Sequence, residues 1–176
     1  MKSAFSPFVA VLVMVADPAV DRSAMEESIV CADGQKRSLF EAYLLTYDER
    51  FLRLKDGAQP RRFTLSPLRQ RVVNRLVDDP DNPTGDELWE LAQACITNVE
   101  DPSGGFTIGE DERQRPDGDG VRALKAEAME RLAGIIGTKA VRELGHALLR
   151  KAMLPEWAVA PFVSAGGTDP ISSTTV

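Results

Sequence analysis

Histidine and cysteine are scarce in this chain of 176 residues, which has one His and two Cys. A single histidine, His146, cannot form a multi-histidine metal centre, and we expect it at the edge of a packed helix face. Cys31 and Cys95 are far apart in sequence, and apolar residues flank both. This setting predicts buried free thiols in a reducing compartment. A disulfide, or a catalytic cysteine with His146 as its base, is the alternative.

Long hydrophobic runs are lacking as well. The apolar stretch at residues 8–16 has nine residues, whereas a membrane-spanning helix needs about 20. As a signal peptide it would have a single lysine before it and Asp17-Pro18 where a small-residue cleavage site belongs. We therefore expect a buried β-strand, or an apolar segment that docks on a partner, and no membrane contact.

The motifs of common enzyme classes are also missing. The sequence contains neither GxSxG nor HExxH, and the glycines at 104, 105 and 109 are not followed by the Lys-Ser/Thr pair of a phosphate-binding loop. Residues 117–120 (DGDG) do not begin a calcium loop, because alanine stands at 128, where an EF-hand has glutamate. We predict no catalytic residue, no cofactor site and no metal site.

Apolar residues recur at helical spacing along most of the chain. Two capping boxes, Ser38 with Glu41 and Thr84 with Glu87, predict where two of the helices begin. The predicted helices cover residues 23–30, 39–55, 67–77, 85–99, 121–135 and 139–152. A strand pair that turns at residues 48–49 is the alternative to the second of these helices. The sequence thus predicts a mainly α fold, a helical bundle with a long acidic loop and extended termini. An α+β fold with a short N-terminal strand or hairpin is the alternative.

The domain organisation follows from changes in composition along the chain. We expect an extended apolar N-terminal segment, a helical region, an acidic Gly/Pro-rich loop, a C-terminal helical hairpin and an extended polar tail. These five parts cover residues 1–22, 23–100, 101–120, 121–163 and 164–176.

The net charge of −6 conceals two blocks of opposite sign. Residues 57–77 contain five arginines and no acidic residue, whereas residues 78–119 contain thirteen acidic residues and two arginines. The arginines form either a solvated helix face neutralised by the chain's own acids or a docking surface for an acidic protein. Nucleic acid is the least favoured partner, because the chain is acidic and few aromatic residues lie among the arginines.

Residues 131–153 could form a helix-turn-helix, since a glycine-containing turn joins two amphipathic stretches. Its second helix has few of the side chains that read DNA near its start. A plain helical hairpin is therefore the favoured interpretation.

Two short stretches and the C-terminal hairpin carry a family resemblance. Residues 94–98 (ACITN), residues 104–107 (GGFT) and the paired helices of 121–153 resemble accessory proteins of tailed bacteriophages, most of all tail assembly chaperone-type proteins. The resemblance covers less than half of the chain. It implies a non-enzymatic protein that binds other phage proteins.

The sequence therefore predicts a structural or assembly component of a tailed-phage-like particle that acts through protein–protein contacts. It would be present in several copies, in the virion or in the host cytoplasm during assembly. A tail assembly chaperone that leaves the particle is the first alternative, and a small helix-turn-helix DNA-binding regulator is the second. The predicted partner-binding residues are Phe5, Phe8, Val11, Val13, Arg61, Arg62, Arg69, Arg71, Arg75, Trp157 and Phe162.

Overall fold

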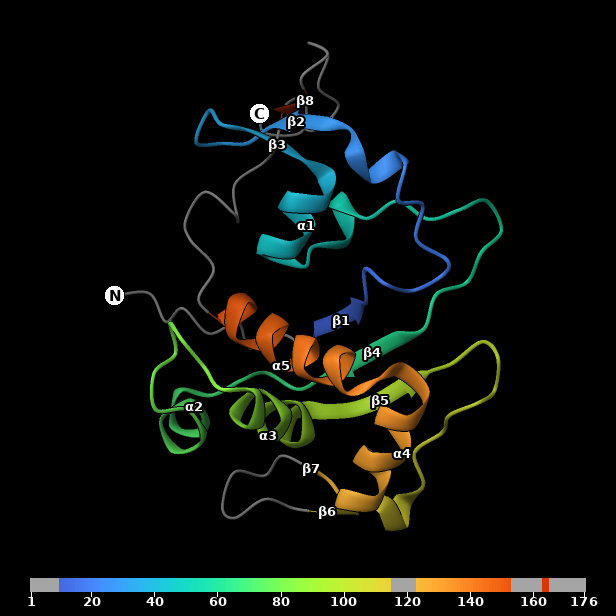
Figure 1. The fold of residues 1–176 in the computed structure, drawn as a ribbon, viewed down its shortest axis with the longest axis vertical. Helices are drawn as coiled ribbons and strands as arrows, with labels where there is room; N and C mark the ends of the chain where they lie inside the picture. The colour runs from blue at the N-terminus through green and yellow to red at the C-terminus, as the bar shows by residue number, and fades with distance from the viewer. Residues whose placement is uncertain (1–9, 115–122, 153–162, 165–176) are drawn as a thin grey trace, which may run out of the picture.

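The computed structural model describes residues 10–114, 123–152 and 163–164. Within these residues the fold is α+β, with five α-helices and three small β-sheets (Figure 1). The mainly α bundle predicted from the sequence is wrong, because short strands between the helices pair into sheets. The helices are α1 (Leu39–Thr46), α2 (Gln70–Leu76), α3 (Gly85–Cys95), α4 (Ala126–Ile136) and α5 (Thr138–Ala152).

The central sheet is antiparallel, in the order β1-β4-β5. Its strands are β1 (Ala10–Val13), β4 (Arg62–Leu65) and β5 (Ile96–Glu100). Strand β4 buries Phe63 and Leu65 and leaves Arg62 and Thr64 partly exposed, the alternation of a strand with one face on the core. This pattern extends over four residues only, too short to stand out from the helical periodicity around it.

Strand β1 confirms the strand interpretation of the N-terminal apolar run for these four residues. On one edge it pairs with β4. The hydroxyl of Tyr43 on α1 donates a hydrogen bond to the carbonyl oxygen of Val13 and accepts one from the Val13 N–H at 3.3 Å. Tyr43 is fully buried, so this pair of bonds fastens α1 to the central sheet.

Two smaller sheets lie at opposite ends of the molecule (Figure 1). One has the order β3-β2-β8 and lies beside α1, and the other is the β6-β7 pair next to α4. Their strands are β2 (Ser28–Val30), β3 (Lys36–Ser38), β6 (Arg113–Gln114), β7 (Ala123–Leu124) and β8 (Val163–Ser164). The helix predicted over residues 23–30 is wrong, because a 3₁₀ turn, η1 (Ala24–Glu26), and β2 take its place.

Helix α1 begins where its capping box predicts and ends earlier than expected. The Ser38 hydroxyl accepts from the Glu41 N–H at 3.1 Å, and the Glu41 carboxylate accepts from the Ser38 N–H at 3.4 Å. Tyr47 then adopts a left-handed conformation with φ of 47°, which stops the helix. The Asp48 carboxylate caps the next 3₁₀ turn, η2 (Glu49–Phe51), by accepting from the Arg50 N–H at 2.9 Å. The prediction of one helix over 39–55 is therefore wrong beyond residue 46.

Three other predicted helices need their boundaries changed. Helix α2 begins at Gln70, later than the Ser66-Pro67 signal suggests. Helix α3 starts at its predicted capping box on Thr84, but it ends at Cys95, and the chain turns directly into β5. Helix α4 begins at Ala126, because residues 123–124 form β7.

Helices α3 and α5 cross at very close range. Helix α5 buries seven of its fifteen residues: Val141, Leu144, Gly145, Ala147, Leu148, Leu149 and Ala152. At the crossing, a Cβ atom built on Gly145 would lie 2.0 Å from the backbone oxygen of Leu88 in α3. Only glycine permits so close an approach of the two helices.

Within the described ranges, no helix has the length and apolar character required to cross a lipid bilayer. The N-terminal residues 1–9, most of the predicted polar tail, and parts of the acidic loop and of the C-terminal hairpin lie outside the described residues. In the described part of the acidic loop, Phe106 is 1% exposed and packs in the core, so this side chain holds the loop against the rest of the protein.

Candidate functional site

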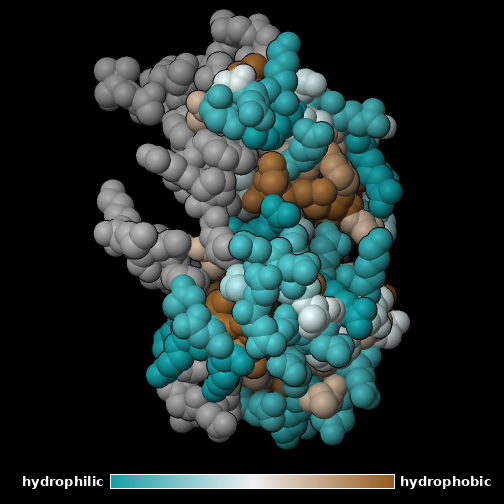
Figure 2. Space-filling view, turned by 60° about the vertical axis from the view of Figure 1, so that its left-hand side comes forward, coloured by the Kyte–Doolittle hydropathy of each residue, from teal (hydrophilic) through white to brown (hydrophobic). Residues whose placement is uncertain are grey.

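A groove of about 610 Å³ lies between α1 and α5. Figure 2 shows hydrophobic side chains gathered at mid-height, in the hollow between the part of the molecule with α1 and the part with α5. The apolar lining consists of Val15, Ala16, Phe40, Leu44, Leu45 and Leu88. The polar lining consists of Arg22, Tyr47, Lys139, Arg142, Glu143, His146 and Arg150.

Helix α1 supplies most of the apolar wall. Its capping box at Ser38 fixes the start of the helix, and the Tyr43 hydroxyl holds it on β1. In this orientation Leu44 and Leu45 are half-buried, while Phe40 remains 39% exposed. An exposed phenylalanine beside partly covered leucines is an apolar surface that a binding partner can desolvate.

Helix α5 supplies a row of basic side chains along the other wall. Lys139, Arg142, His146 and Arg150 follow one another at intervals of three, four and four residues, which places them on one face of the helix. At 1.5 Å per residue the row is about 16 Å long. Arg22 adds a cation from the segment before η1. The groove therefore joins an apolar wall to a cationic one.

Among the described residues that line this groove, Glu143 is the acidic one, and it is half-buried. Burial raises the pKa of its carboxyl group, while Lys139 and a hydrogen bond with Tyr47 act in the opposite direction. Burial, followed by the charge of Arg150, lowers the pKa of His146. His146 is half-buried at the edge of the packed face of α5, as predicted.

The described residues offer little that could carry out covalent chemistry or hold a metal. Both cysteines are buried and free, as predicted, and burial raises the pKa of the Cys95 thiol to about 12. A thiol with that pKa stays protonated at neutral pH and is a poor nucleophile. Among the described residues, no cluster of three or more His, Cys, Asp or Glu could hold a metal ion.

A second groove of about 610 Å³ lies between the loop after β1 and helix α4. Here Arg61 forms an ion pair with Asp101 at 3.2 Å, and the Arg61 N–H donates to the Asp17 carboxylate at 2.9 Å. Ile135 of α4 lines this groove and is 40% exposed. Asp101 thus neutralises the Arg61 guanidinium, whereas the Asp17 carboxylate accepts from the backbone N–H groups of Arg61 and Ala19.

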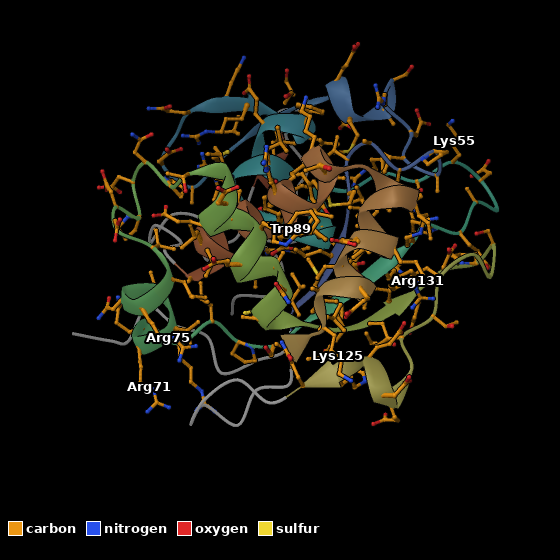
Figure 3. The ribbon with its side chains drawn as sticks, turned by 60° about the horizontal axis from the view of Figure 1, so that its bottom comes forward. Lys55, Arg71, Arg75, Trp89, Lys125 and Arg131 are labelled. Carbon is orange, nitrogen blue, oxygen red and sulfur yellow. The ribbon has the colours of Figure 1, made fainter. Side chains whose placement is uncertain are left out.

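The arginines predicted to bind a partner are not on one surface. Arg61 lies in the second groove, and Arg62 forms an ion pair with Glu49. The other three lie at or on α2, and Figure 3 shows the two on the helix, Arg71 and Arg75, at an edge of the molecule. Arg69, Arg71 and Arg75 each have an interaction partner.

The predicted apolar contacts also differ from one another. Val11 on β1 is 41% exposed, whereas Val13 is fully buried in the protein's own core. Val13 is therefore a packing residue and offers no surface to a partner. Phe5, Phe8, Trp157 and Phe162 lie outside the described residues.

The sequence alone did not single out the residues that line the groove, namely Phe40 and the basic row of α5. Their spacing on α5 was visible in the sequence, but it reads there as the solvated side of an amphipathic helix. The row lines a groove only because α1, about a hundred residues earlier in the chain, supplies the apolar wall opposite it. Comparison of the chain with protein-family models, with curated proteins and with solved structures found no match.

Proposed function

We propose that this protein works by binding other proteins, as a non-enzymatic structural or assembly component of a tailed-phage-like particle. The observation that carries the proposal is the α1–α5 groove, where the exposed Phe40 lies opposite a row of basic side chains. The short stretches that resemble tailed-phage accessory proteins supply the biological setting. Its partners would be other phage structural proteins, in the virion or in the host cytoplasm during assembly.

The chemistry of the groove favours protein contact over catalysis. Its apolar wall can be desolvated by a partner, and its cations can orient that partner. Within the described residues, the groove lining includes the Glu143 carboxyl group, the His146 imidazole and the Tyr47 hydroxyl, and burial disfavours the charged form of each. A binding role uses both the apolar wall and the row of cations.

The two alternatives differ in what α5 must do. In the DNA-binding alternative, α5 would be the recognition helix and would need a free face for the major groove. However, α5 packs on α1, α3 and α4, and its basic face lines the groove. This packing argues against the DNA-binding regulator. The chaperone alternative uses the same groove for a partner that is released later.

Purified particles from the native source provide the test. We expect quantitative mass spectrometry to find the protein at a fixed copy number per particle. In cells that lack the wild-type gene, a Phe40→Asp variant should fail to enter particles. Ile135→Asp is the matched control, because Ile135 is equally exposed and lies on a helix outside the α1–α5 groove.

Each outcome has a distinct meaning. A protein that is absent from particles but required for tail formation would support the chaperone alternative. A protein that is neither present in particles nor needed for their assembly would overturn the proposal. Equal incorporation of Phe40→Asp and Ile135→Asp would show that the groove is not the contact surface.

A further inference from the structure

The two walls of the α1–α5 groove run side by side and differ in chemistry. One wall presents Phe40, Leu44 and Leu45 from α1. The other presents the basic row of α5, from Lys139 to Arg150, over about 16 Å. A ligand that fills this groove needs an apolar face that packs against α1. It also needs negative charges along the adjoining flank, repeated over the three turns of α5 that carry the basic row.

Several cations of the groove have no counterion among the residues that the structure describes. Arg142 approaches Asp86 at 3.8 Å, but both side chains are well exposed, so this pair is weak. Among the residues that the structure describes, no carboxylate lies within 4.0 Å of the charged groups of Arg22, Lys139 or Arg150. Glu143 offsets part of this charge, but burial raises its pKa and thus disfavours its ionised form. The groove therefore carries excess positive charge beside its apolar wall.

We propose that the occupant is an amphipathic α-helix of a partner protein, with acidic residues along one flank of its apolar face. This inference rests on the proposed function and names the chemistry of the partner. A helix that lies along α5 would repeat its own side chains every three or four residues, the same interval as the basic row. Its acidic residues would then face Lys139, Arg142 and Arg150, while its apolar residues cover Phe40 and Leu44.

The shape of the site favours a helix over a membrane surface. The apolar side chains lie in a hollow between two helices, with the charges on one wall, whereas a bilayer needs apolar residues that protrude from a surrounding ring of cations. An extended peptide repeats its side chains on one face about every 6.6 Å, so over the three intervals of the basic row it would drift out of register by about 3 Å. Both the apolar stripe and the charge row thus fit a helix.

The test uses the full-length protein and three fluorescently labelled synthetic helices of about five turns. All three carry the same leucine face, and its flank bears glutamate, glutamine or lysine. Fluorescence anisotropy in about 0.05 M salt should show that the glutamate helix binds about tenfold more tightly than the glutamine helix, as two or three exposed charge pairs predict. In about 0.3 M salt, this preference should shrink.

Two variants assign the preference to the two walls. Lys139→Glu combined with Arg150→Glu should reverse the order, so that the lysine helix binds best. Phe40→Asp should weaken all three helices, whereas the matched variant Ile135→Asp should leave them unchanged. All four substituted residues are exposed, and circular dichroism checks that each variant is folded.

Several results would overturn this inference. One is equal binding of the three helices, or none. Another is tight binding to vesicles of phosphatidylglycerol and phosphatidylcholine in their place. A third is a dimer in light scattering that Phe40→Asp abolishes, because the occupant would then be a second copy. If any of these occurs while Phe40→Asp still prevents incorporation into particles, the proposed function stands and only the acidic helix is refuted.

Discussion

Gly145→Ala is the substitution that most directly tests the close crossing of α3 and α5. The new Cβ would lie 2.0 Å from the Leu88 oxygen, 2.7 Å from its carbonyl carbon and 2.9 Å from its Cα. Ordinary van der Waals contact begins at 3.4 Å, so the nearest approach is short by about 1.4 Å. The obstructing atoms are backbone atoms of α3, which cannot rotate away. The two helices must therefore separate.

Two opposing effects set the size of the change. In a helix, alanine is favoured over glycine by about 1 kcal/mol. Overpacking a core costs about 1–3 kcal/mol, and a clash with rigid backbone belongs at the upper end of that range. Separating the helices also loosens buried contacts of Leu91, Leu144 and Leu148. We expect a net loss of about 2 kcal/mol, or a fall in Tm of about 4–8 °C for a chain of this size.

Urea unfolding followed by circular dichroism measures this loss, and the chain offers a matched control. Gly134 is also within a helix, α4, but a Cβ built on it meets no atom within 4 Å. Gly134→Ala should therefore show the propensity gain alone and stabilise the protein by about 0.5–1 kcal/mol. If Gly145→Ala is as stable as Gly134→Ala, the reasoning about the crossing is refuted.

Three further predictions concern groups that are buried or half-buried. Because burial raises the folded-state pKa of Glu143 above its unfolded value of about 4.5, folding loses stability as pH rises through that pKa. In urea unfolding at pH 7, Glu143→Gln should thus be more stable than the wild type. This difference in stability should vanish below pH 4.5. An equal difference at both pH values would contradict the reasoning. Tyr43→Phe leaves a buried N–H and carbonyl of β1 unpaired and should cost about 1–3 kcal/mol in the same assay; an unchanged midpoint would mean that the hydroxyl is dispensable. Cys31 and Cys95 are each 2% exposed, so a thiol reagent at pH 8 should modify them only after unfolding, and rapid reaction of the native protein would disprove their burial.

Local signals in the sequence were sufficient to locate two helix starts and one strand. The capping boxes at Ser38 and Thr84 predict the first turns of α1 and α3, because each box is complete within four residues. The apolar run before Asp17 predicts a strand, and β1 lies within it. In each case the interactions that decide the structure are close together in the chain.

Long-range pairing explains most of what the sequence did not predict. Strand β4 is recognisable only through its partners β1 and β5, one of which is about fifty residues earlier in the chain. The apolar residues after Tyr47 keep a helical spacing, yet its left-handed conformation ends α1, and Phe51 reaches the core from a 3₁₀ turn. The groove depends on the same kind of distant pairing, between α1 and α5.

Helix α5 packs against α3 on one face and lines the groove on the adjoining face, and this has a genetic consequence. A screen for loss of partner binding should return substitutions at Gly145, although a partner in the groove would not touch that residue. Because the obstructing atoms belong to the backbone of α3, a change of side chain at position 88 should not restore binding to such variants. Natural sequences of this kind should therefore keep glycine at position 145, whereas a charge reversal on the basic row should be accompanied by a change in the partner.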